Sequence, residues 1–317
     1  MLKISCSTIP ILFVLCRYIS AVKRNKASGV KPDGRKVISM SLYGKDPRYT
    51  WGVIRNAQLV PVYLPDWTLR VYVAAEQAPP ELSVPPRIIN KLRLLGAEIA
   101  EVSTGNSITP RNWRLLVAND EQIDYFLIRD ADTRLSEREA VIIKDWLSTA
   151  VKNGPRSNVI HCIRDHPKHA DQAIIDGVWG GRPRMLYHRL NKHITDIPEL
   201  SSSASSKEMN AVLNSVLWPA VADVAYCHDS VSPCDRWSPA ASRHAFPIAR
   251  SGQDYLGQKF DQHQELLSND GDQIKSYVMC PDASDSLVLP SNYTTVRPAV
   301  SVISTLSSAS GVSGNHI

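Results

Sequence analysis

Two aspartates, Asp130 and Asp132, stand two residues apart directly after the apolar stretch 123–129. Ser136 and Glu139 follow as an S-x-x-E capping box, which predicts the start of a helix. The carboxylates therefore lie in an irregular loop between a strand and a helix, where side chains at i and i+2 can face one point. Carboxylate oxygens suit Mg²⁺ or Mn²⁺, which leave other coordination positions to phosphate oxygens.

Two arginines, Arg129 and Arg134, flank this pair and offer further hydrogen-bond donors to phosphate. A divalent ion between the carboxylates would neutralise charge on a departing diphosphate. A lone D-x-D is also common in solvated loops, so a surface turn is the alternative interpretation. The strand before the pair and the capped helix after it favour the metal–diphosphate interpretation.

A second polar group follows the predicted strand 158–164, in the sequence Arg164-Asp-His-Pro-Lys-His169. Asp165 is the candidate general base that takes a proton from an acceptor hydroxyl, and His166 is its candidate partner in binding sugar or pyrophosphate. The alternative is a structural turn, in which the aspartate orders the loop.

Two further sites have both a functional and a structural interpretation. Trp179, in the glycine-rich segment that begins at Gly177, offers an aromatic face to a sugar ring or serves as a core anchor. His228 stands beside Asp229, either as a metal ligand oriented by its neighbour or as an ordinary surface pair.

The elements that must position these residues alternate along the chain. Apolar, β-branched strand-like runs are interleaved with stretches whose apolar residues recur at helical spacing. This alternation predicts an α/β fold with a mostly parallel sheet and helices on both faces. Ligands of such sheets bind at the carboxyl ends of the strands, which is where the candidate residues stand. The predicted strands cover 37–42, 69–74, 97–102, 123–129 and 158–164.

Composition limits the class of protein. The chain has 317 residues, 43% of them apolar and 21% charged, which excludes a disordered chain. No run of five Lys or Arg accompanies the net charge of +5, so we expect no nucleic-acid partner. No P-loop, dinucleotide or nucleophile-elbow motif is present in the sequence.

The two ends of the chain differ from its body. Residues 9–16 form a short apolar run before a basic cluster, which resembles a secretory signal or a weak membrane anchor. Together with a glycosylation sequon at Asn292, this favours the secretory pathway, with the cytoplasm as the alternative. We expect a leader at 1–34, one domain at 35–265 and a Ser-rich tail at 266–317. Cys227 and Cys234 are close enough in sequence to pair.

Several segments together resemble nucleotide-sugar glycosyltransferases of the GT-A type. They are ISMSLYGKDPRYTWGVIRNAQL (38–59), RDADTRLSERE (129–139), IRDHPKH (163–169), GVWGG (177–181), CHDS (227–230) and YLGQKFD (255–261). The resemblance spans about 38–261. It implies a Rossmann-like GT-A fold and transfer of a sugar from a nucleoside-diphosphate sugar to a glycan or another hydroxyl acceptor.

The resemblance also assigns roles to individual residues. It makes Asp130 and Asp132 the ligands of Mn²⁺ or Mg²⁺, with His228 as the third. Residues at the donor nucleotide or its phosphates are Tyr43, Gly44, Arg114, Arg129, Arg134 and Lys259. Gly177 and Trp179 contact sugar or acceptor.

Two departures from the family pattern stand in this sequence. Asp176-Gly177 replaces a double glycine, and Met209-Asn210 replaces an Asp-Gln pair. We therefore expect a metal-dependent glycosyltransferase, with an inactive glycan- or nucleotide-binding relative as the alternative. A metal-dependent phosphohydrolase that uses the same aspartates and His166 is a third possibility.

Overall fold

The structure is a computed structural model, and it describes residues 34–103, 105, 107–152, 158–231, 242–252 and 254–267. The predicted leader up to residue 33, the sequon at Asn292 and the tail beyond residue 267 lie outside the described residues, as do Cys6, Cys16, Cys234 and Cys280. Within the described ranges, every helix is too short or too polar to cross a bilayer.

Strands and helices alternate through most of the chain. The strands are β1 (Lys36–Ser41), β2 (Thr68–Ala74), β3 (Glu98–Val102), β4 (Tyr125–Arg129), β5 (Ile160–Arg164), β6 (Val178–Gly181), β7 (Ala225–Asp229) and β8 (Ser242–His244). The α-helices are α2 (Pro47–Tyr63), α3 (Pro86–Leu94), α4 (Glu137–Lys152), α5 (Pro183–Leu190), α6 (Pro198–Ser202), α7 (Ser206–Val212) and α8 (Trp218–Val221). Shorter elements are the 3-10 helices η1 (Pro110–Asn119), η2 (Pro167–His169), η3 (Ile194–Asp196) and η5 (Ala222–Val224), and the π-helical turn η4 (Leu213–Leu217).

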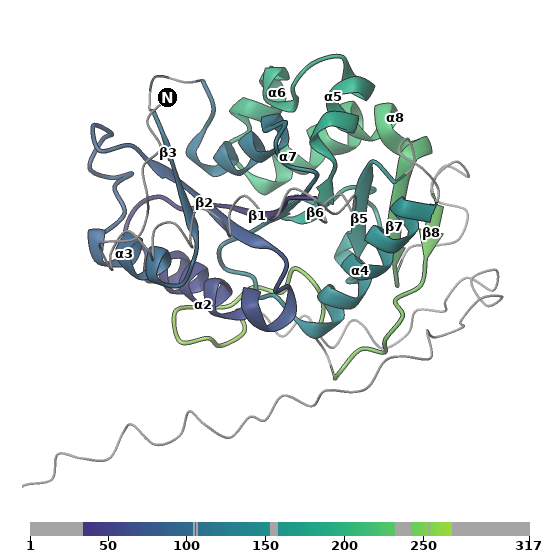
Figure 1. The fold of residues 1–317 in the computed structure, drawn as a ribbon, viewed down its shortest axis with the longest axis horizontal. Helices are drawn as coiled ribbons and strands as arrows, with labels where there is room; N and C mark the ends of the chain where they lie inside the picture. Colours follow the sequence, from purple (N-terminus) through teal and green to yellow (C-terminus); the bar gives the residue numbers. More distant parts are fainter. Residues whose placement is uncertain are drawn as a thin grey trace, which may run out of the picture. The chain divides into compact units, whose positions relative to one another are not determined.

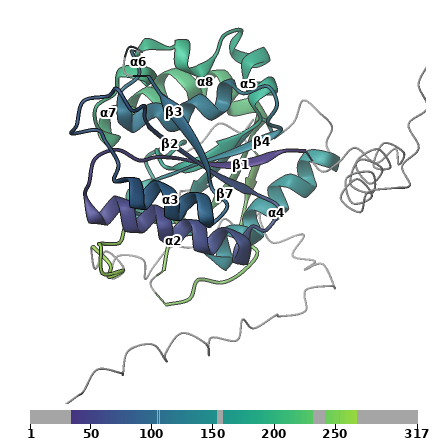
Figure 2. The same ribbon diagram turned by 60° about the vertical axis from the view of Figure 1, so that its left-hand side comes forward.

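In the described part of the chain, the eight strands form one sheet in the order β3-β2-β1-β4-β6-β5-β7-β8. Strand β6 runs antiparallel to β4 and β5, and the other neighbouring pairs are parallel. Helices α2, α3 and α4 cover one face of the sheet, and α5 to α8 cover the other (Figures 1 and 2). The predicted α/β fold is confirmed, because the sheet is mostly parallel and has helices on both faces.

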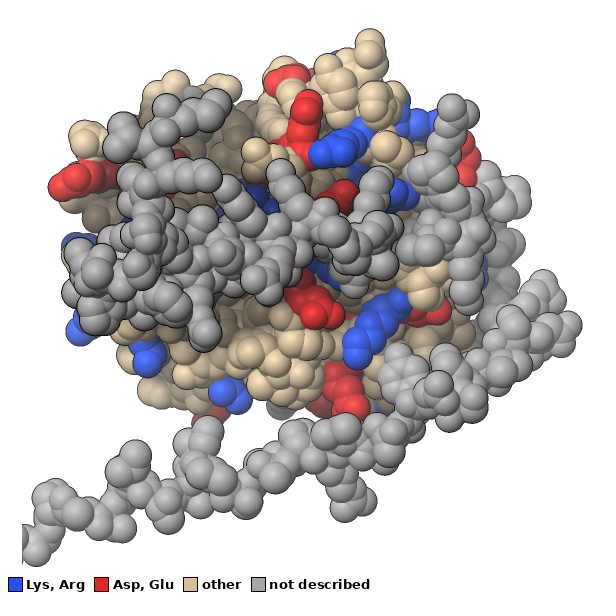
Figure 3. Space-filling model, in the orientation of Figure 1, with Lys and Arg blue, Asp and Glu red and all other residues tan. Residues whose placement is uncertain are grey.

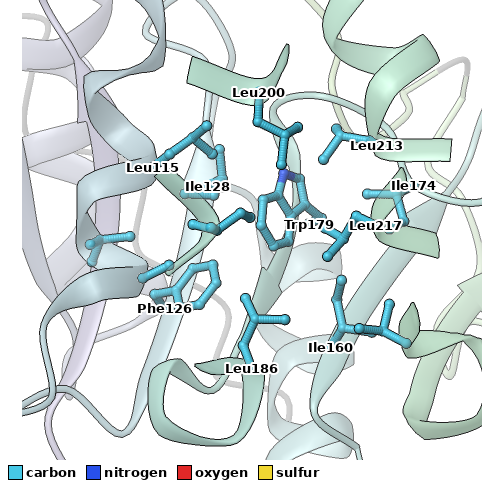
Figure 4. Packing of buried hydrophobic residues seen from close by; sticks show 14 of the residues in the cluster. Leu115, Phe126, Ile128, Ile160, Ile174, Trp179, Leu186, Leu200, Leu213 and Leu217 are labelled. Carbon is cyan, nitrogen blue, oxygen red and sulfur yellow. The ribbon is translucent and has the colours of Figure 1, made fainter. Parts of the chain in front are cut away.

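Side-chain alternation along the strands builds a core on each side of the sheet. In β4, Leu127 packs toward the α2–α3–α4 layer, whereas Phe126 and Ile128 pack into the opposite core. Trp179 of β6 lies at the centre of that second core, fully buried beside Phe126 (Figure 4). The prediction that Trp179 contacts a sugar is therefore wrong, and its interpretation as a core anchor is confirmed.

The surface carries charges of both signs. On the face drawn in Figure 3, the coloured basic and acidic side chains are interspersed rather than gathered by sign.

Candidate functional site

The ends of three strands define the candidate site. Strands β1 and β4 are parallel neighbours, so their carboxyl ends reach the same edge of the sheet. Strand β6 is antiparallel to β4 and begins at Val178, opposite Arg129. Residues 130–132, which leave β4, and residues 176–177, which lead into β6, therefore meet at this edge.

Helix α2 packs directly against the aspartate loop. An added Cβ at Gly52 would lie 2.1 Å from the carbonyl oxygen of Ala131, so only glycine fits this contact. Asn56 of α2 donates to the carbonyl of Thr133 (2.7 Å) and accepts from the amide of Leu135 (3.1 Å). These contacts fix the loop before any ligand binds.

Asp130 lies between two basic side chains. One carboxylate oxygen pairs with Arg114, and the other lies 3.6 Å from the ammonium of Lys259. Burial by itself would raise the pKa of Asp130, but Arg114 and Lys259 outweigh it and hold the pKa below its usual value. Gly177 borders the same carboxylate, since an added Cβ there would lie 2.5 Å from it.

The two neighbouring carboxylates are also paired. Asp132 pairs with Arg48 and lies 3.9 Å from Lys259, and Asp176 pairs with Arg111 and, at 2.5 Å, with Arg114. The cluster thus contains the carboxylates of residues 130, 132 and 176 and the four cations of residues 48, 111, 114 and 259. Four positive and three negative charges give it a net charge of +1.

Three of the four cations are more exposed than any of the carboxylates, whereas the Arg114 side chain is 4% exposed and that of Asp130 13%. The side chains of Asp132 and Asp176 are each 2% exposed, whereas those of Arg111, Arg48 and Lys259 are 22%, 29% and 42% exposed. A ligand that approaches this edge therefore meets guanidinium and ammonium groups first. Such a surface is suited to a phosphate-bearing anion.

Asp130 and Asp132 fit part of a divalent metal site. Their hard oxygens lie together at the strand end, and a Mg²⁺ or Mn²⁺ ion can complete its shell with phosphate oxygens and water. Among the described residues, no group of three or more His, Cys, Asp or Glu side chains could hold a metal ion. Any ion here would need the ligand's own oxygens.

His228 does not complete this site. It is fully buried in β7, where its ring lies 2.8 Å from His161 and 3.2 Å from Asp145 of α4. Strands β6 and β5 stand between β7 and β4 in the sheet. The prediction of His228 as the third metal ligand is therefore wrong.

Asp165 is a buried anchor in this structure. Its carboxylate accepts five hydrogen bonds, two from Arg138 and one each from Arg250, Ser230 and the backbone amide of Leu256. The side chain is 0% exposed. This saturation contradicts an open general base and gives Asp165 a role in tying residues 250–256 to the end of β5.

His166 is also enclosed. It is 1% exposed, accepts a hydrogen bond from the amide of Lys168 (3.1 Å) and packs 4.3 Å from the ring of Tyr255. This burial contradicts direct contact with sugar or pyrophosphate. It also removes the second group that a phosphohydrolase would require.

Arg129 has a structural role. Its guanidinium pairs with Glu139 and donates to the carbonyls of Ile128 (2.7 Å) and Trp179 (2.9 Å). The side chain is 3% exposed. The prediction that Arg129 binds phosphate is therefore wrong, because the side chain points into the fold rather than to the edge.

The other predicted residues remain near the edge. Tyr43 is 40% exposed, with its ring edge-on to Trp113 at 6.3 Å. Burial raises the pKa of Tyr43, and the positive charges of Arg111 and Arg114 oppose the shift. Gly44 follows it and donates to the carbonyl of Leu82 (3.0 Å).

Sequence reasoning missed Arg48, Arg111 and Asp176 as members of the cluster. Arg48 had a signal, because it follows Asp46-Pro47 at a helix start just after β1. Asp176 precedes Gly177, but its position depends on the antiparallel direction of β6, which the sequence did not indicate.

Comparison with known proteins gives partial structural matches. The chain matches no protein-family model, and no curated protein matches it. The mannosyltransferase PcManGT from Pyrobaculum calidifontis, in complex with GDP-Man and Mn²⁺, is 17% identical over 70% of this chain and 62% of its own, with a TM-score of 0.37. S. aureus TarS 1–349 is 15% identical over 57% of this chain and 56% of its own, with a TM-score of 0.34. This chain therefore spans less than two thirds of either structure.

Proposed function

We propose that the chain is a glycosyltransferase that takes its sugar from a nucleoside-diphosphate sugar. The observation that supports this most is the cluster at the carboxyl edge of β1 and β4, in which partly exposed Arg48, Arg111 and Lys259 stand over buried carboxylates. A diphosphate is the ligand that best matches several cations around one point. The sequence resemblance to GT-A transferases points to the same donor.

Different residues at this edge bind different parts of the donor. Arg48, Arg111 and Lys259 bind the diphosphate, and Tyr43 offers a half-exposed ring to the base. Asp130 and Asp132 would hold Mn²⁺ or Mg²⁺, which neutralises charge on the diphosphate. Gly177 packs so closely against Asp130 that any larger side chain would displace this carboxylate from the proposed metal site.

These side chains stabilise the leaving group. When the bond between the anomeric carbon and the diphosphate oxygen breaks, the oxygen keeps the electron pair and the negative charge. The guanidinium and ammonium groups already lie at that position, so little reorganisation is needed as the charge develops. The oxygen of the acceptor hydroxyl forms the new bond to the anomeric carbon, and its proton passes to solvent water.

Calorimetric titration with nucleoside-diphosphate sugars tests the proposal. With Mn²⁺ present, we expect UDP-glucose or GDP-mannose to bind the native chain and to lose at least tenfold in affinity in Arg48→Gln and in Asp130→Asn/Asp132→Asn. Arg55→Gln is the matched control, because Arg55 is an exposed arginine on the same helix as Arg48. Equal affinities in all four proteins would reject the site.

A binding protein without turnover is the second candidate. It is favoured by the burial and saturation of Asp165, which removes the predicted general base. Donor binding with neither transfer nor hydrolysis above a protein-free blank would identify this case. Release of free sugar or a glycosylated product from the donor would exclude it.

A further inference from the structure

A cavity of about 340 Å³ lies on the other side of the segment that carries Lys259. It opens between the first turn of α4 and residues 248–251 and 254–260, part of the yellow-green segment that passes α4 in Figure 1. Its volume falls within the range of small-molecule sites. The residues that matter for its chemistry are Arg134, Arg138, Asp254, Tyr255, Gln258 and Phe260.

One segment separates this cavity from the aspartates. Lys259 pairs in an antiparallel bridge with Thr133, and the amide of Phe260 donates to the carbonyl of Asp132 (2.9 Å). Successive side chains of extended backbone point to opposite sides. Accordingly, Lys259 points to the carboxylates, whereas Gln258 and Phe260 line the cavity. A ligand in the cavity would be a close neighbour of the proposed donor site.

Arg134 carries a hydrogen-bond donor that the fold leaves unused. Its Nε donates to Gln264 (3.0 Å) and its Nη1 to the carbonyl of Thr133 (2.7 Å), while the guanidinium lies 5.0 Å from the ring centre of Phe260. Its Nη2 is buried and has no partner among the described residues. A buried, unsatisfied N–H is costly.

The charges around the cavity cancel. Its lining contains Arg134, Arg138, Glu137 and Asp254, which gives two positive and two negative charges. Arg138 is already committed to Asp165 at 2.9 Å. This balance gives an anion no advantage, but it suits hydroxyl groups, which both donate to carboxylates and accept from guanidinium groups.

Two aromatic rings complete the lining. Tyr255 is held against His166, and Phe260 is held by its own backbone bond and by Arg134. Rings that line a cavity can offer apolar surface to the C–H groups of a pyranose while neighbouring polar groups reach its hydroxyls. Aromatic faces, hydroxyl-matched polar groups and zero net charge are together the chemistry of saccharide recognition.

We propose that this cavity binds an uncharged oligosaccharide, which serves as the acceptor. The acceptor role rests on the proposed transferase function, whereas saccharide binding is a separate measurement. In this proposal Tyr255 and Phe260, rather than Trp179, are the aromatic contacts of the acceptor.

Saturation-transfer NMR and calorimetry with maltotriose, mannotriose, cellotriose and chitotriose test the proposal on the full chain. We expect at least one of these trisaccharides to bind. Tyr255→Leu and Asp254→Asn should each weaken that binding at least tenfold, and neither should change the affinity for UDP-glucose or GDP-mannose. Asp254 is exposed, so Asp254→Asn tests the cavity without disturbing the core. Tyr187→Leu is the control, because Tyr187 is a 40% exposed tyrosine that lines a different pocket.

The outcomes separate the two proposals. Nucleotide-sugar binding without binding of any trisaccharide overturns the cavity assignment and leaves the donor site intact. If Tyr255→Leu and Asp254→Asn both bind the trisaccharide as tightly as the native chain, the cavity assignment is also overturned. An acidic galacturonate trimer tests the charge argument, and tenfold tighter binding of this trimer than of all four neutral trisaccharides would overturn the assignment as well. If the native chain binds a trisaccharide but neither UDP-glucose nor GDP-mannose, the proposed transferase function is overturned and the saccharide site remains.

Discussion

The Lys259 ammonium lies 3.6 Å from the carboxylate of Asp130, and the same nitrogen lies 3.9 Å from that of Asp132. One positive charge thus stands between the two groups that would hold a divalent ion. Lysine and metal therefore compete for the same oxygens, and a diphosphate that draws Lys259 away would favour metal binding.

Lys259→Met tests this competition. Without nucleotide, we expect the variant to bind Mn²⁺ about fivefold more tightly than the native chain, because a partly exposed ion pair of about 1 kcal/mol no longer opposes the metal. Electron paramagnetic resonance of free Mn²⁺ during titration measures the affinity. Lys144→Met, at an exposed lysine of α4, is the control. An unchanged affinity in Lys259→Met would show that the lysine does not compete.

Gly52→Ala tests the contact between α2 and the aspartate loop. The new methyl group would collide with the carbonyl of Ala131, which is backbone and cannot rotate away. We expect a loss of about 1–3 kcal/mol in the free energy of unfolding, typical of overpacking, measured by urea denaturation. Gln58→Ala, at an exposed position of the same helix, should change stability little. Equal stability of the two variants would contradict the close contact.

Asp165→Asn distinguishes an anchor from a catalytic base. The change leaves Arg138 and Arg250 without their shared buried carboxylate. We expect a loss of about 3 kcal/mol or more in the free energy of unfolding, whereas a surface carboxylate such as Asp66 should tolerate the same change. An Asp165→Asn protein that keeps its stability but loses only turnover would restore Asp165 as the base.

The buried histidines predict acid sensitivity. Burial lowers the pKa of His161 well below its ordinary value, and the neighbouring His228 lowers it further. Between that lowered pKa and about 6.5, the unfolded chain binds more protons than the folded one. The neutral, buried form of His161 therefore contributes fully to the free energy of unfolding above pH 6.5. This contribution is lost as the pH falls from 6.5 toward the lowered pKa.

Urea unfolding between pH 7 and pH 5 measures this effect. The slope for one such histidine is at most about 1.4 kcal/mol per pH unit. His161→Gln should flatten the pH dependence of the native chain, and the exposed His188→Gln should not. Parallel curves for the native chain and His161→Gln would rule out this origin of acid sensitivity.

The sequence predicts the sheet and the location of the aspartates because these follow from local pattern. Alternating strand and helix signals imply parallel strands, and parallel strands bring Asp130 and Asp132 to the carboxyl edge whatever the rest of the chain does. The helix start at Ser136 is likewise local, and its hydroxyl accepts from the amide of Glu139 at 3.3 Å, whereas the Glu139 carboxylate pairs with Arg129 instead of completing a capping box.

The partners of buried polar groups are not local, and this is where the sequence misleads. In the sequence, Asp165 has the features of an unpaired acid. In the structure, Arg250, which lies 85 residues later in the chain, donates a hydrogen bond to its carboxylate. In the sequence, His228 could serve as a metal ligand. In the structure, the pairing of β7 with β5 places its ring against His161. Strand β6 is short and contains two glycines, so its composition resembles a turn, and its direction is set by the neighbouring strands.

The reversed direction of β6 has a consequence for how proteins of this shape can diversify. Because β5 ends and β6 begins at the same edge, the connection 165–177 never crosses to the opposite side of the sheet. Ala173 and Ile174 of this connection are buried, but Lys168 and Asp171 are exposed, so insertions between these two would remodel the outer part of the connection and leave strand register and both cores in place. Substrate preference can therefore change within this connection without altering the scaffold that carries it.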